Sequence, residues 1–70
     1  LRLAEGTART ELARVHLALG QHGKAQRAVE RAIRLLRACG HRPGLDHALE
    51  VAEAVRDANA DVSPAPAPPP

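Results

Sequence analysis

The chain has 70 residues, a net charge of +2 and no Phe, Trp, Tyr or Met. Its large aliphatic residues are nine Leu, five Val and one Ile, too few to offset the conformational entropy of folding unaided. These features exclude more than one small domain in these residues, a transmembrane span and, because Cys39 is the only cysteine, an internal disulfide. We expect further protein to complete the core, and a reducing cytoplasm as the compartment.

The two parts of the chain carry opposite charge. Residues 1–42 hold nine basic and three acidic side chains, a net charge of +6. Residues 43–70 hold one basic and five acidic side chains, a net charge of −4. Such an asymmetry can direct packing or the choice of a partner.

Residues 2–19 are expected to form one helix. Apolar side chains recur there at spacings of three and four, and we call this row the apolar stripe: Leu1, Ala4, Ala8, Leu12, Val15 and Leu19. The stripe runs past Gly6, although glycine costs about 1 kcal/mol in a helix interior; a junction between two helices, with Thr7 as N-cap, is the alternative. Ala13 and Leu17 form a second, narrower strip, so we expect this helix to pack on two sides.

The segment LALGQHGKAQRA, residues 17–28, resembles a phosphate-binding loop because a lysine follows its second glycine. Such a loop needs a preceding strand, a first glycine five positions before the second, and a hydroxyl residue after the lysine. Here a helix precedes the loop, Ala18 replaces the first glycine and Ala25 replaces the hydroxyl. We therefore predict a plain turn, with Gly20 in the left-handed conformation and residues 21–23 reversing the chain.

Residues 24–38 show the clearest helical pattern. One arc holds only apolar side chains, and Gly40 follows as a C-terminal cap; the arc comprises Ala25, Ala28, Val29, Ala32, Ile33, Leu35 and Leu36.

The segment HRPGLD then predicts a turn, with Asp46 capping a third helix over residues 44–59 and Asn59 as its left-handed end. The face expected to be buried comprises Leu45, Ala48, Ala52 and Val55, flanked by Leu49 and Val51. Residues 63–70 alternate Pro and Ala and are expected to be a disordered tail or linker.

The first two helices and their turn resemble the tetratricopeptide repeat (TPR) family, in which small residues at fixed points allow close helix pairs. The matching residues are Leu12, Ala13, His16, Gly20, Ala25, Val29 and Ala32. A second repeat would begin with Val51, Ala52, Val55 and Asn59, 39 residues later rather than the usual period of about 34. Longer repeats of this kind resemble those of bacterial signalling regulators. The resemblance implies an all-α fold for residues 1–62: an antiparallel hairpin plus a third helix, as a TPR-like α-solenoid fragment of a larger protein.

A TPR-like array implies a non-catalytic scaffold that binds a protein, a peptide or neighbouring repeats of the same chain. Its first and third helices would line a concave face, presenting Thr7, Thr10, Arg14, Leu17, Asp46, Leu49, Glu53 and Arg56. Of these, the expected partner-binding residues are Thr10, Arg14, Leu17, Leu49, Glu53 and Arg56. The alternative is a structural or self-associating helical spacer.

Other chemistry finds less support in the sequence. Cys39, His41 and His47 are too loosely spaced to predict a metal site, and no catalytic arrangement or cofactor motif can be placed, so we expect no enzyme.

Residues Arg27, Arg31 and Arg34 form a basic stripe that could contact nucleic acid. Because Glu30 interrupts this stripe and no aromatic side chain is available for stacking, we expect it to be a solvated outer face.

Overall fold

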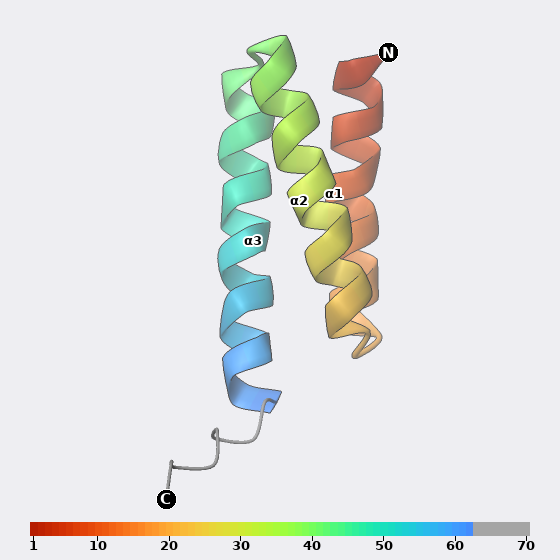
Figure 1. The fold of residues 1–70 in the computed structure, drawn as a ribbon, viewed down its shortest axis with the longest axis vertical. Helices are drawn as coiled ribbons and strands as arrows, with labels where there is room; N and C mark the ends of the chain where they lie inside the picture. Colours follow the sequence, from red (N-terminus) through yellow and green to blue (C-terminus); the bar gives the residue numbers. More distant parts are fainter. Residues whose placement is uncertain (63–70) are drawn as a thin grey trace, which may run out of the picture.

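The computed structural model describes the backbone of residues 1–62 and the side chains of residues 1–60. It contains three α-helices, α1 (Arg2–Ala18), α2 (His22–Cys39) and α3 (Arg42–Val62). Figure 1 shows α2 running antiparallel to both of its neighbours, with short connections at opposite ends. The predicted all-α hairpin with a packed third helix is therefore confirmed, and α1 passes through Gly6 without a break. No helix within residues 1–62 is long and apolar enough to cross a membrane.

The turn between α1 and α2 is shorter than expected. Gly20 has a φ of 76°, the left-handed conformation predicted for it. The backbone N–H of Gln21 donates to the carbonyl of His16 at 2.8 Å, and the carbonyl of Gln21 accepts from Ala25 at 2.9 Å. Because this second bond already closes a helical turn, α2 begins at His22 rather than at residue 24.

The connection between α2 and α3 also uses a left-handed glycine, Gly40, with a φ of 70°. The sequence predicts that α3 begins at residue 44, but it begins at Arg42. Pro43 can occupy the first turn because the backbone N–H that proline lacks would have no partner within the helix there. The N-terminal cap is His41, whose Nδ1 accepts the backbone N–H of Gly44 at 3.0 Å. Asp46, the expected cap, instead lies 3.5 Å from the guanidinium of Arg42.

The end of α3 differs from the expected end at Asn59. The helix continues to Val62, and no residue other than glycine has a positive φ in the described part of the chain. Asn59 Nδ2 donates to Gln26 Oε1 at 2.8 Å, so this side chain connects α3 to the start of α2. The predicted tail, residues 63–70, lies outside the described residues.

The core lies between the three helices and follows the apolar arc of α2. All seven residues of the predicted arc are buried or partly buried. The buried residues of the three helices form two clusters. The first comprises Ala13, Ala25, Ala28, Val29, Val51 and Val55, and the second comprises Ala32, Leu36 and Ala48. Nearly all of these side chains are small, so the helices approach closely and Leu36 is the largest that is fully buried.

The buried face of α1 is not the one that the sequence favoured. The apolar stripe is exposed, with Leu12, Val15 and Leu19 at 43%, 53% and 66%. The buried residues of α1 are Gly6, Thr10 and Ala13, with Leu17 packed against the core. At 3.6 residues per turn, this face lies roughly 180° from the apolar stripe. The sequence predicted that α1 packs on two sides. In the structure the side with Ala13 and Leu17 packs on the core, and the side with the apolar stripe is exposed.

Gly6 allows the close approach of α1 to α2. A Cβ atom at this position would lie 2.7 Å from Leu36 Cγ and 2.9 Å from Leu36 Cδ2. One turn later, the Thr10 hydroxyl is buried and donates to the Gly6 carbonyl at 2.9 Å. A polar side chain can therefore occupy this face without leaving its hydroxyl unpaired.

Replacing Gly6 by alanine should lower the free energy of unfolding by about 1–2 kcal/mol, because the added methyl group overpacks a fully buried Leu36. This loss should appear although alanine favours helix by about 1 kcal/mol. Gly23→Ala is the matched control, since its Cβ would meet only the flexible Arg27 side chain at 3.6 Å. It should raise stability by about 0.5–1 kcal/mol. Thermal unfolding followed by circular dichroism compares the two, and stabilisation by Gly6→Ala would contradict the crossing.

Candidate functional site

A groove runs between α1 and α3, and we call it the α1–α3 groove. Its volume is about 310 Å³. The residues that line it come from the C-terminal half of α1 and the middle of α3: Arg14, Leu17, Ala18, His47, Glu50, Val51 and Ala54. Apolar side chains thus form its floor and charged side chains form its rim.

Polar contacts around Glu11 hold the rim of the α1–α3 groove. Arg14 Nη1 donates to Glu11 Oε2 at 2.8 Å, and His47 Nε2 of α3 lies 3.5 Å from Glu11 Oε1. The other imidazole nitrogen, His47 Nδ1, lies 3.8 Å from Glu50 Oε2. These side chains remain half-exposed, so their groups stay available to a ligand.

The floor of this groove is continuous with the core. Leu17 packs against the first core cluster, and Val51 belongs to it. Ala18 and Ala54 are exposed beside them. Small side chains at these two positions leave room for a ligand side chain to reach the apolar floor.

The structure places the predicted partner-binding residues in three different environments. Arg14 and Leu17 line the α1–α3 groove as expected. Thr10 is buried against Gly6 and cannot reach a partner. The remaining three, Leu49, Glu53 and Arg56, are exposed but lie roughly 130° around α3 from the groove-lining residues. Outside the predicted set, Thr7 and Asp46 are also exposed.

His47, Glu50 and Ala54 were missed by the sequence reasoning. They lie on the flank of the buried face of α3 that is turned toward α1. The sequence identified the buried face through Ala48 and Val55. It contained no signal to tell which of the two flanks α1 would border.

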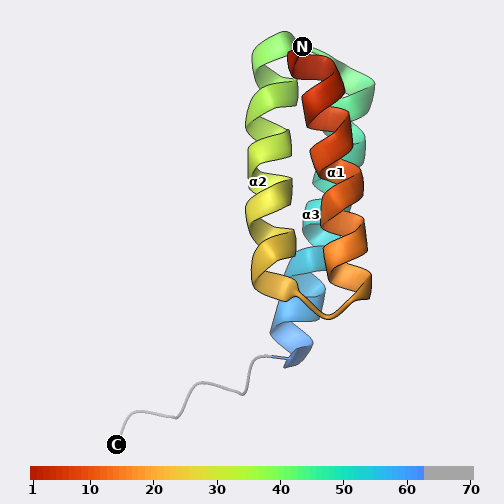
Figure 2. The same ribbon diagram turned by 90° about the vertical axis from the view of Figure 1, so that its right-hand side faces the viewer.

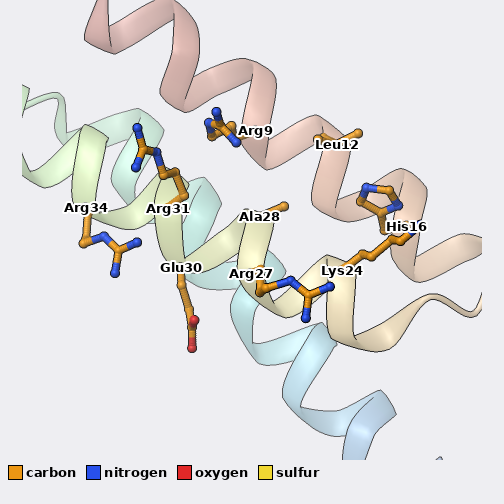
Figure 3. A pocket seen from close by; sticks show the side chains of 9 residues that line it. All are labelled: Arg9, Leu12, His16, Lys24, Arg27, Ala28, Glu30, Arg31 and Arg34. Carbon is orange, nitrogen blue, oxygen red and sulfur yellow. The ribbon is translucent and has the colours of Figure 1, made fainter.

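A second groove runs between α1 and α2 on the side away from α3, and we call it the basic groove. Its volume is about 420 Å³. Figure 3 shows Arg31 and Lys24 of α2 extending toward Arg9 and His16 of α1, whereas Glu30 and Arg34 point away from α1. Its lining comprises Arg9, Leu12, His16, Lys24, Arg27, Ala28, Glu30, Arg31 and Arg34. The three arginines of the predicted basic stripe are exposed, as expected, and they also line one wall of this groove.

One carboxylate modifies the upper end of the basic groove. Glu5 Oε2 accepts a hydrogen bond from Arg9 Nε at 2.9 Å and lies 3.8 Å from Arg31 Nη2. The hydrogen bond from Arg9 is the main reason that the pKa of Glu5 lies below its usual value. The carboxylate is thus ionised at neutral pH and offsets part of the positive charge of Arg9 and Arg31.

Metal ligands do not gather in the described part of the chain. No group of three or more His, Cys, Asp or Glu side chains is placed to hold an ion there. Cys39 is exposed, and its Sγ donates to the Leu36 carbonyl at 3.5 Å. His41 caps α3 and His47 lies in the α1–α3 groove.

Comparison with known proteins does not assign the chain to a family. No family model, curated protein or solved structure is significantly similar to it. The resemblance to the TPR family thus stays a prediction, and the candidate function depends on the geometry of the grooves.

Proposed function

We propose that the protein is a non-catalytic protein–protein interaction scaffold whose α1–α3 groove binds a peptide segment of a partner. The observation that supports this most is the apolar floor of the groove between two charged walls. In the TPR-like arrangement implied by the sequence, these two helices are the first helices of successive repeats. They are the helices expected to border a peptide.

The dimensions and charges of the groove favour a short peptide over a small cofactor. A volume of about 310 Å³ is at the lower end of ligand pockets, enough for two or three side chains. Arg14 on α1 and Glu50 on α3 carry opposite charges on opposite walls. We therefore expect a segment with an apolar residue between an acidic and a basic one.

The apolar stripe of α1 supports a place within a longer array of a TPR-containing regulator. Scattered exposed apolar residues are ordinary, but a row along a whole helix is typical of an interface. A neighbouring repeat packed on Leu12, Val15 and Leu19 would bury it. The same stripe is what favours the second candidate function, a helical spacer that only joins repeats.

Ala54→Arg tests the proposed groove. The new side chain would extend over the apolar floor from an exposed position, so the fold should be retained while the peptide is excluded. Peptides selected from a random display library on the immobilised chain should lose at least about tenfold in affinity, about 1.4 kcal/mol.

The matched control is Ala38→Arg, an equally exposed alanine on α2 outside both grooves. It should leave the affinity of the same peptides within about twofold, as fluorescence anisotropy can measure. Failure to select any peptide, or equal losses in the two variants, would contradict the proposal.

A further inference from the structure

We propose that the protein associates head to tail with copies of itself, through contacts between the basic groove of one copy and α3 of the next. The part of α3 that docks is a line of carboxylates that we call the acidic row: Asp46, Glu50, Glu53 and Asp57. This inference concerns surfaces other than the floor of the α1–α3 groove and does not depend on the proposed peptide binding.

The charges of the two surfaces are opposite in sign and similarly spaced. Five cationic side chains and one carboxylate line the basic groove, and four carboxylates form the acidic row. Along α2 the cations recur at spacings of 3, 4 and 3, over residues 24–34, about 15 Å of helix. Along α3 the carboxylates recur at spacings of 4, 3 and 4, over residues 46–57, about 17 Å. Two helices laid side by side can therefore pair these charges along their whole length.

Much of this charge is not paired within the molecule. Among the side chains of residues 1–60, Lys24, Arg27 and Arg34 have no carboxylate within 4.0 Å. In the same part of the chain, Glu53 and Asp57 have no cationic partner within that distance. All five are exposed. A contact between copies can therefore form new ion pairs without breaking existing ones at these positions.

Apolar side chains accompany the charges on both surfaces. The basic groove contains Leu12, which is 43% exposed, and Ala28. Beside the acidic row, Leu49 is 40% exposed and lies one turn from Glu53. Seating Leu49 over Leu12 of the next copy would remove both from water. Exposed ion pairs alone contribute little to association, so this apolar contact is needed to hold the interface.

The two surfaces lie on opposite sides of the molecule. The basic groove opens between α1 and α2 on the side away from α3, and Figure 2 shows α3 behind these two helices. The acidic row lies roughly 180° around α3 from the buried Ala48 and Val55. The contact is heterologous because it joins two different surfaces. Since these surfaces lie on opposite sides of one copy, successive contacts add copies in a row instead of closing a two-fold dimer.

A second copy fits the basic groove better than a nucleic acid does. The chain contains no Phe, Trp or Tyr on which bases could stack. Its net charge is only +2, because the carboxylates of α3 balance the basic groove. The partner that matches this groove in length, charge and apolar content is present on the same chain.

Sedimentation of the 70-residue chain at low and high salt tests this assembly. The average mass should rise with concentration at about 0.05 M ionic strength, and the association constant should fall about tenfold or more at 0.5 M, where exposed charges are screened. Two variants each neutralise one surface with uncharged polar side chains: Arg27→Gln with Arg34→Gln, and Glu53→Gln with Asp57→Asn. Each should remain monomeric and retain its helical circular dichroism. Mixed in equal amounts, they should form a one-to-one dimer and nothing larger, because only one complementary pair of surfaces remains.

A control variant, Arg2→Gln with Arg37→Gln, makes the same change in net charge as the Arg27 and Arg34 variant, at exposed positions outside both grooves and away from α3, and should associate like the natural chain. Ala54→Arg should also associate normally, which separates this proposal from peptide binding. The inference is overturned if the natural chain stays monomeric or if the mixture of the two variants does not associate. It is also overturned if Leu12→Gln abolishes association while both charge variants retain it, which would indicate pairing through the apolar stripe. Binding of an oligothymidylate by a monomeric natural chain, lost in the Arg27 and Arg34 variant, would assign the basic groove to nucleic acid instead.

Discussion

Replacing Leu36 by alanine should destabilise the helical bundle by about 2–5 kcal/mol, the range for truncating a fully buried leucine. Leu36 fills the space where all three helices meet. A Cβ built on Gly6 or on Gly44 would lie 2.9 Å from its Cδ2 atom, so both backbones approach it closely. Helices held at that distance by many other contacts cannot collapse fully into the cavity left by the substitution.

A loss of this size is comparable with the whole stability that a chain of this length usually has. We therefore expect the Leu36→Ala variant to show weak helical circular dichroism and no cooperative transition in urea. Leu49→Ala is the matched control, since its side chain is 40% exposed and belongs to neither core cluster. It should change the free energy of unfolding by no more than about 0.5 kcal/mol. Similar urea midpoints for the two variants would show that Leu36 is not central to the core.

The sequence predicted α2 well because one physical property decided its orientation. Its apolar arc is wide, uninterrupted and opposed by charged residues such as Arg27 and Arg34, which cannot be buried without partners. A single orientation satisfies both sides of such a helix. The structure buries the same arc, and the glycines expected to end α1 and α2, Gly20 and Gly40, have the positive φ that their positions require.

The orientation of α1 could not be obtained in this way. Hydropathy favours the apolar stripe with Leu12 and Val15, whereas the structure buries Gly6, Thr10 and Ala13. Residue size decides here, because two helices can approach closely only where both present small side chains. Ala25 of α2, which shares a core cluster with Ala13, is on the other side of that contact. The small residues of α1 and of α2 can be seen in the sequence. Whether they pack on each other depends on the distance between the two helix axes, and the pattern within one helix does not specify that distance.

Of the residues that line the α1–α3 groove, the sequence reasoning named two on α1 but none of the exposed ones on α3. Arg14 and Leu17, which the TPR resemblance implied, line the α1–α3 groove because they flank the small face of α1 on the side of α3. On α3, both flanks of the buried face contain charged residues. The sequence pattern therefore could not tell which flank borders α1. The structure selects His47 and Glu50, with Glu11 pairing to His47 across the groove. Position within the bundle, rather than residue type, separates the site from the rest of the surface.

Ala25→Leu and Ala32→Leu should each destabilise the bundle by about 1–3 kcal/mol through overpacking. Both alanines are fully buried on α2, and they report on different contacts. Ala25 shares a core cluster with Ala13 of α1, and Ala32 shares one with Ala48 of α3. The larger side chain must push against the neighbouring helix in each case, because both alanines are fully buried between helices.

Arg31→Leu is the control, since it introduces the same residue into the same helix at a side chain that is 51% exposed. It removes only a 3.8 Å contact with Glu5, and exposed pairs of this kind contribute about 0–1 kcal/mol. Urea unfolding at high salt and low concentration keeps association from obscuring the comparison. A loss in Ala25→Leu alone would mean that the first core cluster packs as described while the cluster of Ala32, Leu36 and Ala48 packs loosely. Equal stability of all three variants would show that α2 does not present this face to either neighbour, because a close crossing cannot accept a leucine in place of alanine without cost.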